Sequence, residues 1–103
     1  MDEEDFALRL AMLRTQKGVS ARDMSLSIGQ NHGYINNIES GKASPSLSGI
    51  FYICDYLKIT PCELFDEGNK NPERLNQLIE NLKLLNSKQL DAVSVIVNEL
   101  ANK

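Results

Sequence analysis

The sequence has no tryptophan, a single histidine and two cysteines, and these scarcities exclude several classes of protein. Cys54, Cys62 and His32 form no CxxC or HxxxH spacing, so we expect no metal site. His32 has no Ser or Cys partner placed by a motif, and no Gly-rich phosphate loop or carboxylate pair in a recognisable site occurs. The sequence therefore predicts a protein that is not an enzyme and binds no cofactor.

Long apolar runs are missing as well. No stretch approaches the roughly 18 apolar residues that a membrane-spanning helix needs. The N-terminus MDEEDF is acidic and lacks the basic-then-apolar order of a secretory signal. We expect a soluble, cytoplasmic protein with reduced cysteines and no membrane partner.

Apolar residues recur at spacings of three and four, and no strand alternation appears anywhere. The predicted fold class is all-α. At 103 residues and 42% hydrophobic content, the chain can bury one core and carry a small appendage. The polar segment 66–71 is the one convincing boundary, so we predict domains at residues 1–68 and 69–103.

Caps and stops divide the first domain into five short helices. Ser20 with Asp23 and Thr60 with Glu63 have capping-box spacing, and Asn31 is the expected N-cap of the third helix. The expected helices cover residues 2–17, 20–29, 31–41, 46–57 and 60–65. The second and third form a helix-turn-helix, because only two residues, one of them glycine, separate them. The side chains expected to point inward are Phe6, Leu10, Leu13, Met24, Ile28, Ile35, Ile38, Leu47, Ile50, Ile53, Cys54, Leu57, Leu64 and Phe65.

The third helix buries Ile35 and Ile38 and leaves a polar face without carboxylates. That face carries His32, Tyr34, Asn36 and Asn37. An Asn side chain can pair with adenine N6 and N7 in the major groove, and His or Tyr can reach a phosphate or a base edge. We therefore expect this helix to read double-stranded DNA.

The net charge of −3 argues against a nucleic-acid partner. The distribution of charge answers part of the objection, because residues 9–42 carry five basic residues against two acidic ones. The basic residues are Arg9, Arg14, Lys17, Arg22 and Lys42. Salt screens charges beyond about 10 Å, so the local excess matters more than the total.

The second domain reads as a helical hairpin. Asn71 is the expected cap of a helix that starts at Pro72, and Ser87 is the expected cap of the next. Their apolar stripes are Leu75, Leu78, Ile79, Leu82, Leu85, Leu90, Val93, Ile96, Val97 and Leu100. A segment this short cannot bury two apolar stripes by itself. We therefore expect the stripes to pack on the first domain or on another chain. A self-complementary homodimer is the simplest arrangement.

Taken in order, these motifs resemble the Cro/C1-type helix-turn-helix regulators, also called the XRE family. The resemblance covers residues 6–65 and rests on Leu13-Arg14, Lys17-Gly18-Val19-Ser20, Gly29, Tyr34-Ile35-Asn36-Asn37-Ile38-Glu39-Ser40-Gly41, Pro45-Ser46 and Leu57-Lys58-Ile59-Thr60-Pro61. It implies a five-helix, lambda-repressor-like DNA-binding domain in a bacterial transcription regulator. The hairpin makes the layout similar to the subgroup of Bacillus-type sporulation and biofilm repressors, whose hairpin forms dimers and can be captured by a small antagonist.

The resemblance assigns roles to particular residues. The DNA-binding set is Arg22, Asn31, His32, Gly33, Tyr34, Asn36, Asn37, Ser40, Lys42 and Ser44. Within it, Ser40, Lys42 and Ser44 match positions that clamp the DNA backbone. Arg14 and Glu39 match a structural ion pair between the first and third helices.

The sequence departs from the family pattern in three places. Ala21 replaces a phosphate-contacting Gln, and Arg22 is expected to take over that contact. Met24-Ser25 stands where a small Ala usually follows Leu. Gly33 removes a contact side chain and costs about 1 kcal/mol of helix propensity. Tyr34 also has a structural interpretation, in which its ring packs against the second helix.

We predict a homodimeric regulator, acting as a repressor on an inverted-repeat operator. One alternative is a protein-interaction module that kept the fold and lost DNA affinity. Another is a DNA-binding antitoxin. In these interpretations a small antagonist or a toxin protein would bind the C-terminal hairpin.

Overall fold

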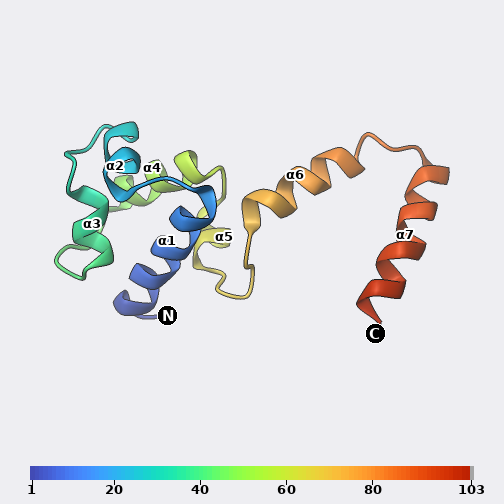
Figure 1. Cartoon of the computed structure of the whole chain (residues 1–103), viewed down its shortest axis with the longest axis horizontal. Coiled ribbons are helices and arrows are strands. Elements are labelled where there is room, and N and C mark those ends of the chain that lie inside the picture. Colours follow the sequence, from blue (N-terminus) through green and yellow to red (C-terminus); the bar gives the residue numbers. More distant parts are fainter. Residues whose placement is uncertain (103) are drawn as a thin grey trace. The chain divides into compact units, whose positions relative to one another are not determined.

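The computed structural model describes residues 1–102, and all regular structure in this part of the chain is α-helical (Figure 1). The all-α prediction is confirmed. The helices are α1 (Glu3–Lys17), α2 (Ala21–Ser27), α3 (Tyr34–Glu39), α4 (Leu47–Leu57), α5 (Pro61–Phe65), α6 (Pro72–Leu82) and α7 (Ser87–Ala101). Across residues 1–102, no helix is both long and apolar enough to cross a membrane.

The chain divides into two compact units, the first ending at Glu73 and the second beginning at Arg74. The sequence placed the boundary earlier, after residue 68. The difference arises because the segment before α6 is bonded to the end of α1. Gln16 Nε2 donates to the Lys70 carbonyl oxygen at 2.7 Å, and Lys17 Nζ lies 3.3 Å from Glu73 Oε2. The first two residues of α6, Pro72 and Glu73, therefore belong to the first unit.

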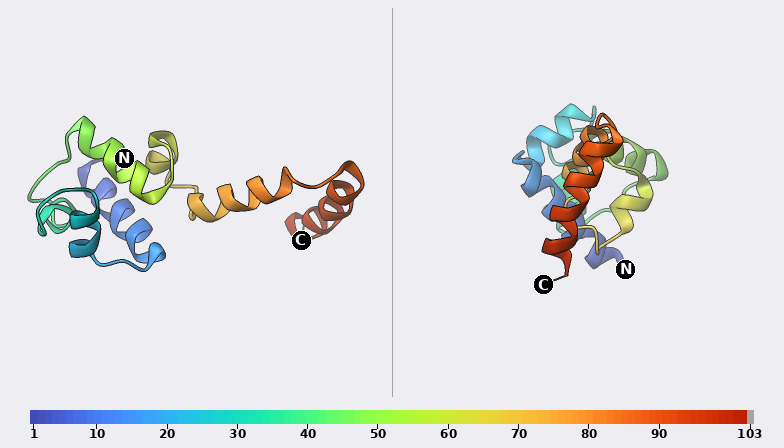
Figure 2. Two further views of the ribbon diagram at one scale, coloured as in Figure 1. Left: turned by 90° about the horizontal axis from the view of Figure 1, so that it is seen from above. Right: turned by 90° about the vertical axis from the view of Figure 1, so that its right-hand side faces the viewer.

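In the first unit, α1 packs against α3, α4 and α5, and α2 packs on α3 (Figure 2). One core joins the five helices. It consists of Phe6, Leu10, Leu13, Met24, Ile35, Ile38, Ile53, Cys54, Leu57 and Leu64. The apolar spacing predicted all ten of these residues correctly.

Leu47 and Phe65 were also expected inside, and both are exposed. Leu47 is the first residue of α4 and lies beyond the edge of the core, with 70% of its surface accessible. Phe65 is the last residue of the short α5, and although its ring centroid lies 5.8 Å from that of Phe6, 48% of its surface is accessible. Helical spacing gives the face of a residue but not how far the core extends along the helix.

Side-chain caps set most helix starts. Ser20, Ser46 and Thr60 each accept the backbone N–H three residues later, at 3.0, 3.0 and 3.1 Å. The predicted cap of α7 is wrong by one position, because Asn86 accepts the Gln89 N–H at 2.9 Å and Ser87 is the first helical residue. An Asn side chain in extended backbone suits that cap at least as well as Ser.

The second unit carries most of α6 and all of α7. No residue of α7 is buried, and the one buried residue of α6 is Pro72, in the first unit. The predicted apolar stripes are largely accessible in the single chain, with Leu78 at 54% and Ile96 at 60% exposure. Large exposed apolar patches are uncommon on folded proteins and are typical of interaction sites.

Candidate nucleic-acid interface

Helix α3 is short, with one side buried in the core and the other exposed. Ile35 and Ile38 are buried in the core, while Asn36 and Asn37 are exposed. The helix ends in a Schellman motif, in which the Gly41 N–H donates to the Ile38 oxygen at 3.1 Å and the Lys42 N–H to the Asn37 oxygen at 2.9 Å. Gly41 has φ +79°, a conformation that favours glycine. The predicted glycine stop is therefore present.

The start of α3 differs from the prediction. Asn31 does not cap the helix. Its Oδ1 accepts the Gly33 N–H at 3.0 Å in the turn before α3, and Gly33 occupies the N-cap position without a side chain. The Ile35 N–H is instead accepted at 2.9 Å by the hydroxyl oxygen of Ser25, a buried residue of α2. A residue ten positions earlier in the chain thus supplies the cap.

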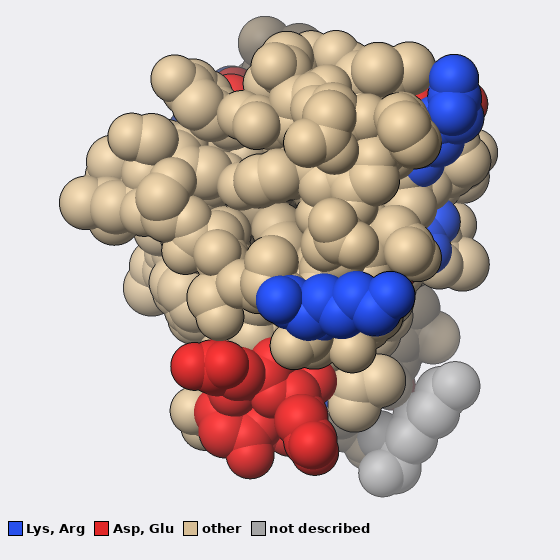
Figure 3. Space-filling model, turned by 90° about the vertical axis from the view of Figure 1, so that its left-hand side faces the viewer, with Lys and Arg blue, Asp and Glu red and all other residues tan. Residues whose placement is uncertain are grey.

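The predicted DNA-contacting residues lie at one end of the first unit, on α2, α3 and the turns around them. Gly33 and Tyr34 are half-buried, and the remaining members of the set are exposed. Figure 3 shows this end of the protein as a largely uncharged surface, with few Lys or Arg side chains and one acidic cluster at its edge. Such a surface would bind a polyanion mainly through neutral hydrogen-bonding groups.

The hydroxyl group of Tyr34 lies against α4. Its hydroxyl oxygen lies so close to Gly49 that a Cβ added at residue 49 would collide with it. Burial raises the pKa of the Tyr34 hydroxyl. The phenol therefore stays protonated at neutral pH and joins the first residue of α3 to the first turn of α4.

Arg14 and Glu39 form a two-pronged ion pair between α1 and the last residue of α3. Arg14 Nε donates to Glu39 Oε2 at 2.8 Å, and Nη2 donates to Oε1 at 2.9 Å. The third guanidinium nitrogen donates to the Val19 carbonyl oxygen at 2.9 Å. The hydrogen bond to Glu39 raises the pKa of Arg14. The pair fixes the C-terminal end of α3.

Arg9 does not contribute to the basic surface counted from the sequence. It is only 4% exposed, with Nε and Nη2 donating to the carbonyl oxygens of Leu64 and Glu63 at 2.9 and 2.8 Å. It therefore caps the C-terminal end of α5. Among the five cations of residues 9–42, Arg22 and Lys42 are the exposed ones. The positive charge available to DNA is smaller than the sequence suggested.

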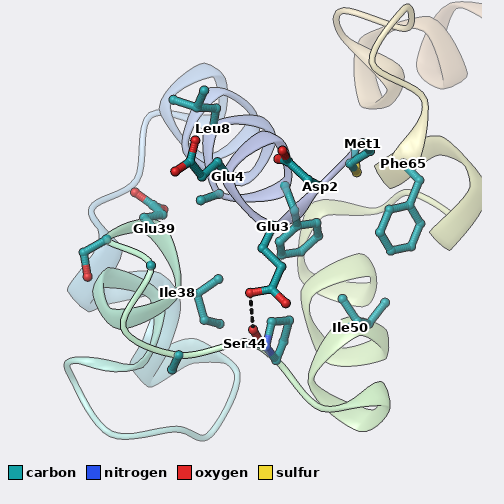
Figure 4. A pocket seen from close by; sticks show the side chains of 16 residues that line it. Met1, Asp2, Glu3, Glu4, Leu8, Ile38, Glu39, Ser44, Ile50 and Phe65 are labelled. Carbon is teal, nitrogen blue, oxygen red and sulfur yellow. Dashed lines mark hydrogen bonds between the residues drawn. The ribbon is translucent and has the colours of Figure 1, made fainter.

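An acid-rimmed groove of about 880 Å³ lies next to the loop that follows α3 (Figure 4). Its walls come from the N-terminal residues and first turns of α1, from residues 38–41 and 43–45, and from Ile50 and Phe65. Ser44 donates to Glu3 across the groove, with 3.4 Å between Oγ and Oε2. In this arrangement the Glu3 carboxylate competes with any phosphate for the Ser44 hydroxyl.

Comparison with known proteins identifies the domain. The model of the family described as Helix-turn-helix (HTH_3) matches residues 10–64, which is more than half of the chain. The chain belongs to this helix-turn-helix family. Its members are DNA-binding transcription regulators of the Cro/C1 type, not enzymes. No curated protein sequence matches the chain.

One solved structure supports the assignment. The chain is similar to the restriction-modification controller protein C.AhdI from Aeromonas hydrophila, with a TM-score of 0.59 and 36% sequence identity. The match covers 93% of that protein and 62% of this chain. More than a third of this helix-turn-helix protein therefore has no counterpart in the controller.

Proposed function

We propose that this helix-turn-helix protein regulates transcription by placing α3 in the major groove of double-stranded DNA. The observation that carries the proposal is the two-sided character of α3. Ile35 and Ile38 anchor it in the core, while Asn36 and Asn37 project amide groups that can pair with base edges. The ends of α3 are held by Ser25 and Arg14, so the amides are presented on a rigid element.

The surrounding residues would hold the DNA backbone. Arg22, Ser40, Lys42 and Ser44 are exposed polar groups on either side of α3, suited to phosphate contacts. Asn31 and His32 lie in the turn that leads into the helix. Gly33 has φ −95°, and an added Cβ would meet only ordinary contacts, so the fold itself does not demand a glycine there. A glycine at residue 33 would instead allow the DNA to approach the backbone closely at the start of α3.

We further propose that the protein acts as a homodimer through the exposed stripes of α6 and α7. Burying these stripes against a second copy would remove a large apolar surface from water. Two copies of α3 related by a two-fold axis would enter successive major grooves about 34 Å apart, and the operator would be an inverted repeat. Repression in the cytoplasm, as in the Bacillus-type sporulation and biofilm regulators that the layout resembles, is the mode of action we favour.

Two single substitutions test the division between base reading and backbone contact. Asn37→Ala should weaken operator binding about 10-fold, because one two-pronged base contact contributes about 1–3 kcal/mol of discrimination. Its binding to random DNA should change little. Lys42→Ala should weaken operator and random DNA alike and reduce the salt slope by about 1. Titrations of both DNAs at several salt concentrations distinguish the two effects, and equal losses on both DNAs for both variants would contradict the proposal.

A second candidate function is protein interaction without DNA binding, as in an interaction module or an antitoxin component. The burial of Arg9 and the acidic groove beside Ser44 favour it, because both make the α3 surface less attractive to phosphate. A small antagonist or toxin protein would then bind the stripes of α6 and α7. Absence of any DNA binding at low salt would favour this candidate.

A further inference from the structure

The start of α3 receives its cap from another helix. In most helices a side chain at the N-cap position accepts one of the free first-turn N–H groups. Gly33 has no side chain to do so, and the Tyr34 N–H donates to the Asn31 carbonyl oxygen at 3.1 Å. The Ile35 N–H donates to Ser25 Oγ at 2.9 Å, from α3 to α2.

The Ser25 hydroxyl is held in the orientation that this bond requires. It donates its one proton to the Ala21 carbonyl oxygen at 2.7 Å, one turn earlier in α2. A hydroxyl has one proton and two lone pairs, so the lone pairs remain for the Ile35 N–H. Ser25 and Ile35 are both 0% exposed, and water cannot replace the bond without opening the core.

We propose that Ser25 is a positioning residue for DNA recognition, which sets the start of α3 relative to α2 and thereby the placement of its base-contacting amides. This inference rests on the proposed function of α3. The two hydrogen bonds of the Ser25 hydroxyl, one to the Ala21 carbonyl oxygen and one from the buried Ile35 N–H, link the backbones of the two helices. Asn36 follows Ile35 directly, so a shift of the Ile35 backbone moves the first reading side chain.

Replacing Ser25 by alanine removes the acceptor and little else. The change leaves a smaller side chain in a buried position, and the resemblance to the Cro/C1-type family places alanine there in most members. The Ile35 N–H loses its partner in the core, and a buried unpaired donor is costly. We therefore expect the start of α3 to shift or open while the domain stays folded.

The test compares the full-length protein with its Ser25→Ala variant and with Ser27→Ala as the matched control. Ser27 is an exposed serine of the same helix, outside the proposed interface. Hydrogen exchange of the Ile35 amide is followed by NMR. Binding is measured on an operator duplex selected with the wild type and on a random duplex of equal length. Ser25→Cys, which keeps a weak sulfur acceptor, is measured alongside.

For Ser25→Ala we expect Ile35 amide exchange to rise and operator affinity to fall, each by about 5- to 30-fold, the factor that one lost buried contact produces. Random-duplex affinity should change by less than about 2-fold, since contacts to phosphates are sequence-independent. The exchange rate and operator affinity of Ser25→Cys should lie between those of the wild type and Ser25→Ala. Ser27→Ala should match the wild type in both measurements.

Two results would overturn the inference alone. One is a wild type that discriminates between the duplexes while Ser25→Ala discriminates equally well. The other is an Ile35 amide whose exchange is the same in both proteins. A wild type without any sequence preference would overturn the proposed function, and this inference with it.

Discussion

Glu39→Ala is expected to lower the free energy of unfolding by about 3 kcal/mol, because it leaves the guanidinium of Arg14 without its partner. Both side chains are mostly shielded, at 20% and 13% exposure, and joined by two short bonds. The substitution should weaken the contact between α1 and the C-terminal end of α3. Urea unfolding followed by circular dichroism, without DNA, measures it.

The chain offers a matched control. Glu80 pairs with Lys83 at 3.1 Å, but these side chains are 71% and 66% exposed. Glu80→Ala should therefore change the free energy of unfolding by less than about 0.5 kcal/mol. Similar losses in the two variants would show that Glu39 does not have the structural role described.

Leu78→Glu is expected to convert the proposed dimer to a monomer and to weaken operator binding by about 100-fold. The side chain lies on the apolar stripe of α6, and a carboxylate there would have to be buried without a partner on association. Loss of the second α3 removes the gain from binding two half-sites at once, which is about 10²- to 10⁴-fold for linked sites. Analytical ultracentrifugation and operator titration measure the two effects.

Leu84→Glu is the control for this substitution. Leu84 is 83% exposed and lies outside the predicted stripe, so the same change there should leave sedimentation and operator affinity as in the wild type. A Leu78→Glu protein that sediments and binds like the wild type would rule out dimerisation through α6. The stripes would then be available to a different partner.

Local signals in the sequence predicted most of the fold. Ser46 and Thr60 mark helix starts because a cap depends on residues three apart, and Gly18 and Gly41 mark ends because their left-handed backbone suits glycine. Apolar spacing located the core because it, too, depends only on residues three or four apart in the sequence. The predicted burial of Leu47 was wrong, because the spacing of apolar residues along a helix contains no information about where the neighbouring helices stop.

The candidate site was harder to predict wherever contacts joined distant residues. Arg9 looked like surface charge, but the carbonyl groups that bind it belong to residues 63 and 64. Ser25 had one visible signal, a polar residue where the resembled family has alanine, and its partner becomes apparent only when α2 and α3 are packed together. The role of Gly49 was missed for the same reason. Residue 49 must lack a side chain because the Tyr34 hydroxyl, from a different helix, occupies the space beside it.

Sequence reading by α3 is tested most directly by selection of DNA from a random pool with the full-length protein and with an Asn36→Ala, Asn37→Ala double variant. The wild type should enrich an inverted repeat, and the double variant should enrich none, although it folds and still binds DNA weakly. Enrichment of the same repeat by both proteins would show that these amides of α3 do not read the sequence. No enrichment by the wild type at low salt would contradict the DNA-reading function itself.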